Sequence, residues 1–142
     1  MVLENPIRHA TRSGAMVAVA AIVASMFAAP AAHAADPSTK FRLDYGASYA
    51  VGTLRWHARS VDVDFSIKAG YCRELRPFAF DNSGREHRPP WWPGACNKVY
   101  SDTVNVPVDV VGGAFRVRLD LTDEKGKLLV SRPCVKTADC VD

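Results

Sequence analysis

Strict alternation of apolar and polar residues is the feature that most limits what this chain can fold into. In one segment the apolar residues are Val61, Val63, Phe65 and Ile67, and in another they are Phe115, Val117, Leu119 and Leu121. Polar residues occupy the positions between them. Successive side chains of a strand point to opposite faces, so this spacing predicts strands with one dry and one wet face. Helical periodicity is scarce, and we therefore expect a mainly β chain.

Further strands are predicted between turn-forming residues. These strands are Phe41 to Tyr45, Tyr49 to His57, Glu74 to Phe80, Val99 to Val106 and Lys127 to Ser131. The turn-forming positions are Gly70, 81–84, 89–94, Gly112-Gly113 and 123–126. About seven short strands with turns at this spacing predict an antiparallel two-sheet sandwich. Trp56 alternates with Leu54, which places it in the core.

The acidic residues of the predicted wet faces allow two interpretations. Asp62 and Asp64 face Arg116 and Arg118 if their two strands pair in one sheet, which forms a solvent-exposed charge ladder. Alternatively, carboxylates could gather around calcium, since hard cations bind clustered oxygen ligands. The candidates for such a site are Asp44, Asp62, Asp64, Asp81, Asp120 and Asp123. No loop concentrates them at the spacing of an EF-hand, and we expect neither a metal nor another cofactor.

The first 34 residues have the pattern of a cleaved export signal. Arg8, His9 and Arg12 precede an uncharged, Ala-rich stretch, and small residues stand at Ala32 and Ala34. The apolar core is shorter than the roughly 20 residues that a membrane span needs. We therefore expect a signal helix at 1–34 with cleavage after Ala34, a flexible lead-in at 35–39 and a β-sandwich domain at 40–142. The mature protein is expected to be secreted, without a stable membrane span.

The charge of the chain is too small to specify a partner. The formal net charge is +3, and removal of residues 1–34 takes away two basic side chains and one acidic side chain. Lysine and arginine are interspersed and form no basic block, which disfavours nucleic acid as a ligand.

All four cysteines lie after the predicted signal, at Cys72, Cys96, Cys134 and Cys140. An even number of cysteines in an exported chain predicts two disulfides, with three possible pairings. A zinc site is the main alternative, but only Cys134 and Cys140 are closely spaced. We predict Cys72–Cys96 and Cys134–Cys140, of which the first closes a loop of about 25 residues and stabilises by roughly 3 kcal/mol.

Three stretches carry a resemblance to a family. They are Gly52 to Val63, Cys72 to Leu75, and Gly112-Gly113 leading into 115–121. Together they resemble small, uncharacterised secreted bacterial proteins with an immunoglobulin-like β-sandwich. The resemblance implies that fold and a secreted location, and it implies no established activity.

A shorter stretch, Cys96-Asn97-Lys98-Val99-Tyr100, resembles the reactive loop of the secreted subtilisin-inhibitor family. The resemblance implies that Lys98 is the specificity residue, which a trypsin-like protease recognises. A rigid loop next to a disulfide loses little conformational entropy on binding. That family has its other disulfide upstream, whereas this chain has no cysteine before Cys72. The plain alternative is a lysine that follows a disulfide at the start of a strand.

Few residues suggest catalysis. If both disulfides form, no free thiol remains, and no Gly-x-Ser-x-Gly segment is present. His57 lies beside Arg55 and Arg59 on a predicted outward face, which favours a surface histidine. Glu74 with Asp81 or Glu86 could form a glycosidase pair, although acids this common are found in any domain. We therefore expect no enzyme activity.

The segment 88–94 holds Trp91 and Trp92 among three prolines. Rigid aromatic side chains stack on sugar rings and anchor binding surfaces. In the alternative interpretation they fold back and cover one end of the sandwich.

The sequence as a whole predicts a secreted, noncatalytic, monomeric interaction module with a protein or polysaccharide partner. The alternatives are a carbohydrate-binding domain that uses Trp91 and Trp92, and a serine-protease inhibitor that uses Lys98.

Overall fold

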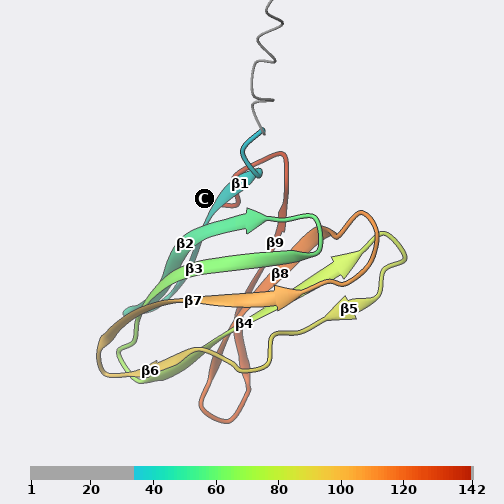
Figure 1. Ribbon diagram of the computed structural model, residues 1–142. Helices are drawn as coiled ribbons and strands as arrows, with labels where there is room; N and C mark the ends of the chain where they lie inside the picture. Colours follow the sequence, from blue (N-terminus) through green and yellow to red (C-terminus); the bar gives the residue numbers. More distant parts are fainter. Residues whose placement is uncertain (1–33, 142) are drawn as a thin grey trace, which may run out of the picture. The chain divides into compact units, whose positions relative to one another are not determined.

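The computed structural model describes residues 34–141, which form two antiparallel β-sheets and contain no helix (Figure 1). The predicted signal segment therefore lies outside the described residues, except for Ala34. The strand order of sheet 1 is β1-β2-β3-β7, and that of sheet 2 is β5-β4-β8-β9, with β6 also paired to β4. Sheet 1 consists of β1 (Ser38–Tyr45), β2 (Ser48–Trp56), β3 (Ser60–Lys68) and β7 (Val99–Pro107). Sheet 2 consists of β4 (Cys72–Asp81), β5 (Glu86–His87), β6 (Gly94–Cys96), β8 (Ala114–Asp123) and β9 (Leu128–Val135).

The core lies between the two sheets and contains most of the residues that alternation placed there. The four apolar residues of β3 are each at most 4% exposed. Trp56 is also buried, and its Nε1 donates a hydrogen bond of 2.8 Å to Thr39 Oγ1. The prediction of a mainly β chain with two antiparallel sheets is confirmed.

Phe115 breaks the predicted alternation of β8. Asp81 of β4 pairs with Ala114 and Phe80 pairs with Arg116, so Phe115 has no partner residue on β4. Such a β-bulge adds one residue to a strand and reverses the facing of the residues before it. Phe115 is 42% exposed as a result, whereas Ala114 is buried. The expectation that Phe115 faces the core is wrong for this reason.

The predicted charge ladder between β3 and β8 does not form, because the two strands belong to different sheets. Asp62 and Asp64 are paired with Arg55 of the neighbouring strand β2. Arg118 instead contacts Asp120 of its own strand and Glu86 of β5.

The strand order differs from that of a constant-type immunoglobulin domain. In that fold one sheet has the order A-B-E-D, so that the second strand pairs with the first and the fifth. Here β2 pairs with β1 and β3, because the chain completes a three-stranded meander before it crosses to sheet 2.

The disulfide Cys134–Cys140 holds the end of the chain against the edge strand β1. Cys140 N donates to Lys40 O at 2.8 Å, and Arg42 N donates to Cys140 O at 3.3 Å, so the segment covers part of an otherwise open strand edge. The C-terminal end lies next to β1 in Figure 1.

Thr39, expected in the lead-in, is buried within β1 and donates a hydrogen bond to Val135 O. Among the described residues there is no helix that could cross a membrane.

Candidate functional site

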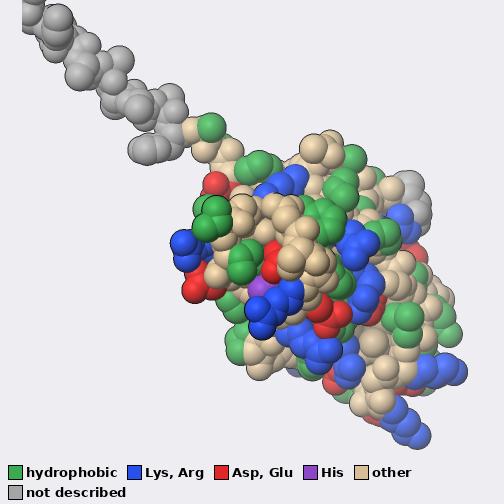
Figure 2. Space-filling model, turned by 90° about the vertical axis from the view of Figure 1, so that its right-hand side faces the viewer, with side chains coloured by type: hydrophobic (Ala, Val, Ile, Leu, Met, Phe, Trp, Pro, Cys, Tyr) green, Lys and Arg blue, Asp and Glu red, His purple; other side chains and the backbone are tan. Residues whose placement is uncertain are grey.

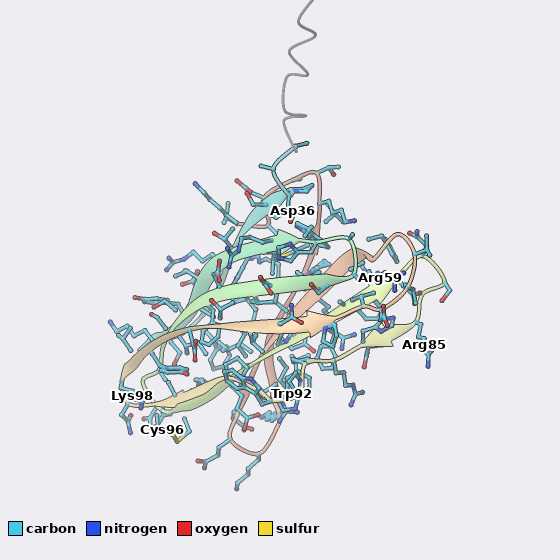
Figure 3. The ribbon with its side chains drawn as sticks, in the orientation of Figure 1. Asp36, Arg59, Arg85, Trp92, Cys96 and Lys98 are labelled. Carbon is cyan, nitrogen blue, oxygen red and sulfur yellow. A yellow bond between two sulfur atoms is a disulfide. The ribbon has the colours of Figure 1, made fainter. Side chains whose placement is uncertain are left out.

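The disulfide Cys72–Cys96 joins β4 to β6 at one end of the molecule. The two cysteines lie directly opposite each other in this antiparallel pair. Both predicted disulfides are therefore present in the structure. Figure 3 shows Cys96 and Lys98 at this end, Arg59 and Arg85 at the opposite end, and Trp92 between them. We call the turns at 45–48, 69–72, 96–100 and 123–127 the disulfide end.

Two adjoining hollows lie beside this disulfide. The first has a volume of about 390 Å³ and the second about 460 Å³. Their walls have in common Cys72, Arg73 and Glu124. The first is completed by Tyr71, Asn97, Asp123 and Lys125, and the second by Glu74, Gly94, Ala95, Cys96 and Lys98. Residues from three separate segments, 71–74, 94–98 and 123–125, thus line one continuous concave surface.

All four tyrosines of the chain lie in or next to the turns of the disulfide end, and a cation stacks on each ring. The guanidinium of Arg73 lies 5.8 Å from the ring centre of Tyr45 and 5.5 Å from that of Tyr71. Tyr49 contacts Arg42 and Lys68, and Tyr100 contacts Lys98. Lys98 was singled out from the sequence, but the tyrosines were not, because the segments that carry them are far apart along the chain.

Lys98 lies in a tight turn and not in an extended loop. Its carbonyl oxygen accepts a hydrogen bond of 3.1 Å from Ala69 N. The preceding residue, Asn97, has a φ of 50°, in the left-handed region that asparagine tolerates better than most residues. A serine protease needs the carbonyl of the residue it reads for its own oxyanion-hole donors. The turn keeps that carbonyl engaged within the protein.

The two predicted binding tryptophans have different surroundings. Trp92 is half-buried, since its ring centre lies 5.2 Å from that of Phe78 and Arg76 stacks on it at 5.6 Å. Trp91 is 42% exposed, and no ring or cation contact is made to it by the described residues. The interpretation as a covering side chain therefore fits Trp92, whereas Trp91 remains available at the surface.

The loop that carries Trp91 is fixed at both ends to the edge of β4. Before it, β5 pairs with Ala79 and Phe80 of β4. After it, Pro93 O accepts a hydrogen bond of 2.8 Å from Leu75 N, and β6 pairs with the first residues of β4. Prolines restrict the backbone within the loop. The position of Trp91 is thus well defined although its side chain reaches solvent.

The opposite end of the molecule also carries many charges, but most of them are paired. Figure 2 shows lysine and arginine side chains on this side with carboxylates between them. Arg59 contacts Asp109, and Arg88 contacts Glu86. Asp81 is buried, and hydrogen bonds from Ser83, and then from His87, hold the pKa of its carboxyl far below the ordinary value.

His57 is engaged on both ring nitrogens. Nδ1 lies 2.5 Å from Asp36 Oδ2, and Nε2 lies 3.0 Å from Asp62 Oδ2. The hydrogen bond to Asp62, followed by that to Asp36, raises the pKa of the imidazole. A general base needs a ring nitrogen within reach of the proton that it removes. Both nitrogens here are already bonded to carboxylates, which suits a structural contact better than proton transfer.

Metal ligands do not gather in the described part of the chain, where no cluster of three or more His, Cys, Asp or Glu could hold an ion. The carboxylates weighed for calcium are distributed over both sheets and several turns. Asp123, for example, accepts hydrogen bonds from the backbone of Lys127 and Lys125, which lower the pKa of its carboxyl.

Comparison with models of protein families, with curated proteins and with solved structures gives no match to this chain. The candidate site therefore rests on geometry alone. It consists of two features, namely the exposed Trp91 on its fixed loop and the two hollows of the disulfide end, whose walls include Arg73, Lys98 and Lys125.

Proposed function

We propose that this chain is an exported, noncatalytic binding module and that Trp91 anchors its ligand. The observation that carries the proposal is the combination of an exposed indole with a loop that is fixed on both sides. Large rigid aromatic side chains supply much of the binding energy of interfaces, because they bury a large area and lose few rotamers on binding.

A polysaccharide is the ligand that suits this anchor best. An indole ring offers a flat apolar face to the apolar face of a sugar ring, and polar groups nearby bind the hydroxyls. Glu74 and Arg76 supply such groups next to the tryptophan loop, where Arg76 Nη2 lies 2.7 Å from Glu74 Oε2. Two disulfides support the proposed exported location, since such bonds persist in oxidising compartments.

The proposal predicts retention of the protein on insoluble polysaccharide. The mature chain is incubated with cellulose, chitin and xylan, and the bound fraction is measured as a function of polysaccharide concentration. Trp91→Ala is expected to weaken binding by about tenfold or more, since a tryptophan anchor contributes roughly 2 kcal/mol. Trp92→Ala is measured beside it, with circular dichroism to verify the fold, because Trp92 also packs on Phe78.

Tyr71→Ala is the matched control, since Tyr71 is an aromatic residue that is 73% exposed at a different place. It should bind as the unmodified protein does. If the unmodified protein is not retained on any of the three polysaccharides, or if Trp91→Ala binds equally well, the proposal is wrong.

A further inference from the structure

We propose that the two hollows beside Cys72–Cys96 form a second binding site, which accepts an acidic peptide segment. This site is separate from the Trp91 loop and does not depend on the function proposed above. Both hollows lie next to the same disulfide, and Arg73 contributes to both walls.

The charges of the hollows favour an anionic ligand. Arg73, Lys98 and Lys125 form no ion pair with a carboxylate of the described residues. Two of the three acidic side chains in the walls are already engaged. Glu74 is bound to Arg76, and Asp123 accepts hydrogen bonds from the backbone of its own turn. Those hydrogen bonds leave Asp123 ionised, so with Glu74 balanced by Arg76, the three cations face the two carboxylates of Asp123 and Glu124, an excess of one positive charge.

The contacts of the Arg73 side chain fix its position before such a ligand binds. Its guanidinium contacts the rings of both Tyr45 and Tyr71, and its Nη1 donates a hydrogen bond of 2.8 Å to Cys72 O. Its Nε is buried without a hydrogen-bond partner, a condition that is uncommon for buried polar groups. A carboxylate that accepts a hydrogen bond from Nη2 adds a charge-assisted contact to a side chain whose position is already fixed.

The surroundings favour a peptide over an isolated small anion. The three-residue strand β6 pairs only with β4 among the described strands, and all three of its residues line the second hollow, where an extended segment can lie beside them. Tyr45 and Tyr71 are 43% and 73% exposed at the rim. Tyrosines that surround adaptable polar groups are typical of surfaces that bind proteins. The disulfide keeps the site rigid and so reduces the entropy lost on binding.

The experiment measures fluorescence anisotropy with two labelled synthetic peptides. One alternates glutamate with valine, and the other has glutamine at each glutamate position. The glutamate peptide is expected to bind saturably, and the glutamine peptide at least about tenfold more weakly. Lys98→Met combined with Lys125→Met should reduce the affinity for the glutamate peptide by about tenfold, because it removes two exposed cations from the walls.

Arg85→Met and Trp91→Ala are the controls. Arg85→Met removes an exposed cation from the opposite end, and Trp91→Ala removes the other proposed anchor; neither should change peptide binding. The inference is overturned if the glutamate peptide does not bind, if both peptides bind equally, or if Arg85→Met weakens binding as much as the double variant. It is also overturned if dextran sulfate binds with the same dependence on Lys98 and Lys125 while the peptide does not saturate.

Discussion

The outer faces of the two sheets are built on different physical principles. The outer face of sheet 1 is a network of polar side chains, as alternation predicts. The outer face of sheet 2 carries aromatic rings covered by guanidinium groups. The outer face of sheet 1 is thus held together by hydrogen bonds between partly solvated side chains. The outer face of sheet 2 is stabilised by burial of apolar surface.

On sheet 1, Asp62 and Asp64 are the centres of the network. Asp64 Oδ2 lies 3.0 Å from Arg55 Nε, and Asp62 Oδ1 accepts a hydrogen bond of 2.7 Å from Asn105 Nδ2. Burial alone raises the pKa of Asp62, but the hydrogen bonds from Asn105 and His57 outweigh it, so that the pKa is lowered. These side chains are partly solvated, and each contact contributes little to stability.

On sheet 2, Phe78 and Phe80 point away from the core and are nevertheless only 8% and 7% exposed. Arg118 lies opposite Phe78 in the register and stacks on its ring at 4.4 Å, and Arg116 stacks on Phe80 at 4.5 Å. The methylene groups of arginine cover apolar surface while the charged group stays in water. The comparison teaches that an outward position is not the same as a wet one.

The largest expected effect comes from Phe78→Ala. It removes a nearly buried ring that Trp92 and Arg118 both contact, and should lower the free energy of unfolding by about 3 kcal/mol. Phe115→Ala is the matched control, because this phenylalanine is 42% exposed and should change the free energy by less than about 1 kcal/mol. Urea denaturation measures both. Equal effects would show that the outer face of sheet 2 is not a second apolar layer.

A smaller difference in the free energy of unfolding is expected between the alanine variants of Arg118 and Arg55. Arg118→Ala uncovers two rings and should cost about 1 to 2 kcal/mol. Arg55→Ala removes contacts of a side chain that is 48% exposed and should cost less than about 1 kcal/mol. The Arg55 effect should decrease further at high salt, which screens surface charges. The distinction between the faces fails if Arg55→Ala is the more destabilising of the two.

The smallest expected effect is a pH dependence of the folding stability, which arises from His57 next to sheet 1. The pKa of His57 is raised from its ordinary value of 6.5 by Asp62 and Asp36, so the folded state binds this proton more tightly than the unfolded state. The stabilisation is complete below pH 6.5 and is lost as the pH rises through the raised pKa. Urea denaturation at a series of pH values should therefore show decreasing stability over this interval. His57→Gln should remove that decrease, and a slope that persists in the variant contradicts the assignment.

The seven longer strands could be predicted, because alternation reports which side of each strand is apolar, whereas the short strands β5 and β6 were not predicted. The disulfide pairing that we predicted, one of three possible pairings, and the buried Trp56 are also present in the structure. The facing of Phe115 could not be predicted, since a bulge depends on how β8 pairs with β4. Nor could the grouping of Asp62 and Asp64 with Arg55, because charges along a strand do not specify which strand lies next to it.

For the candidate site, the sequence indicated Trp91, Trp92 and Lys98 as unusual residues in their local context. The structure separated the two tryptophans by their exposure and placed Lys98 in a turn whose carbonyl is engaged. It also gathered Tyr45, Tyr71 and Arg73 around the hollows.

The sequence by itself determined the longer strands, the presence of two disulfides and most of the core, because these depend on periodicity and on the number of cysteines. Only the tertiary structure decided which strands share a sheet, which outward rings are covered and which turns meet around Cys72–Cys96. Those outcomes depend on contacts between residues that are distant along the chain, and no local pattern records such contacts.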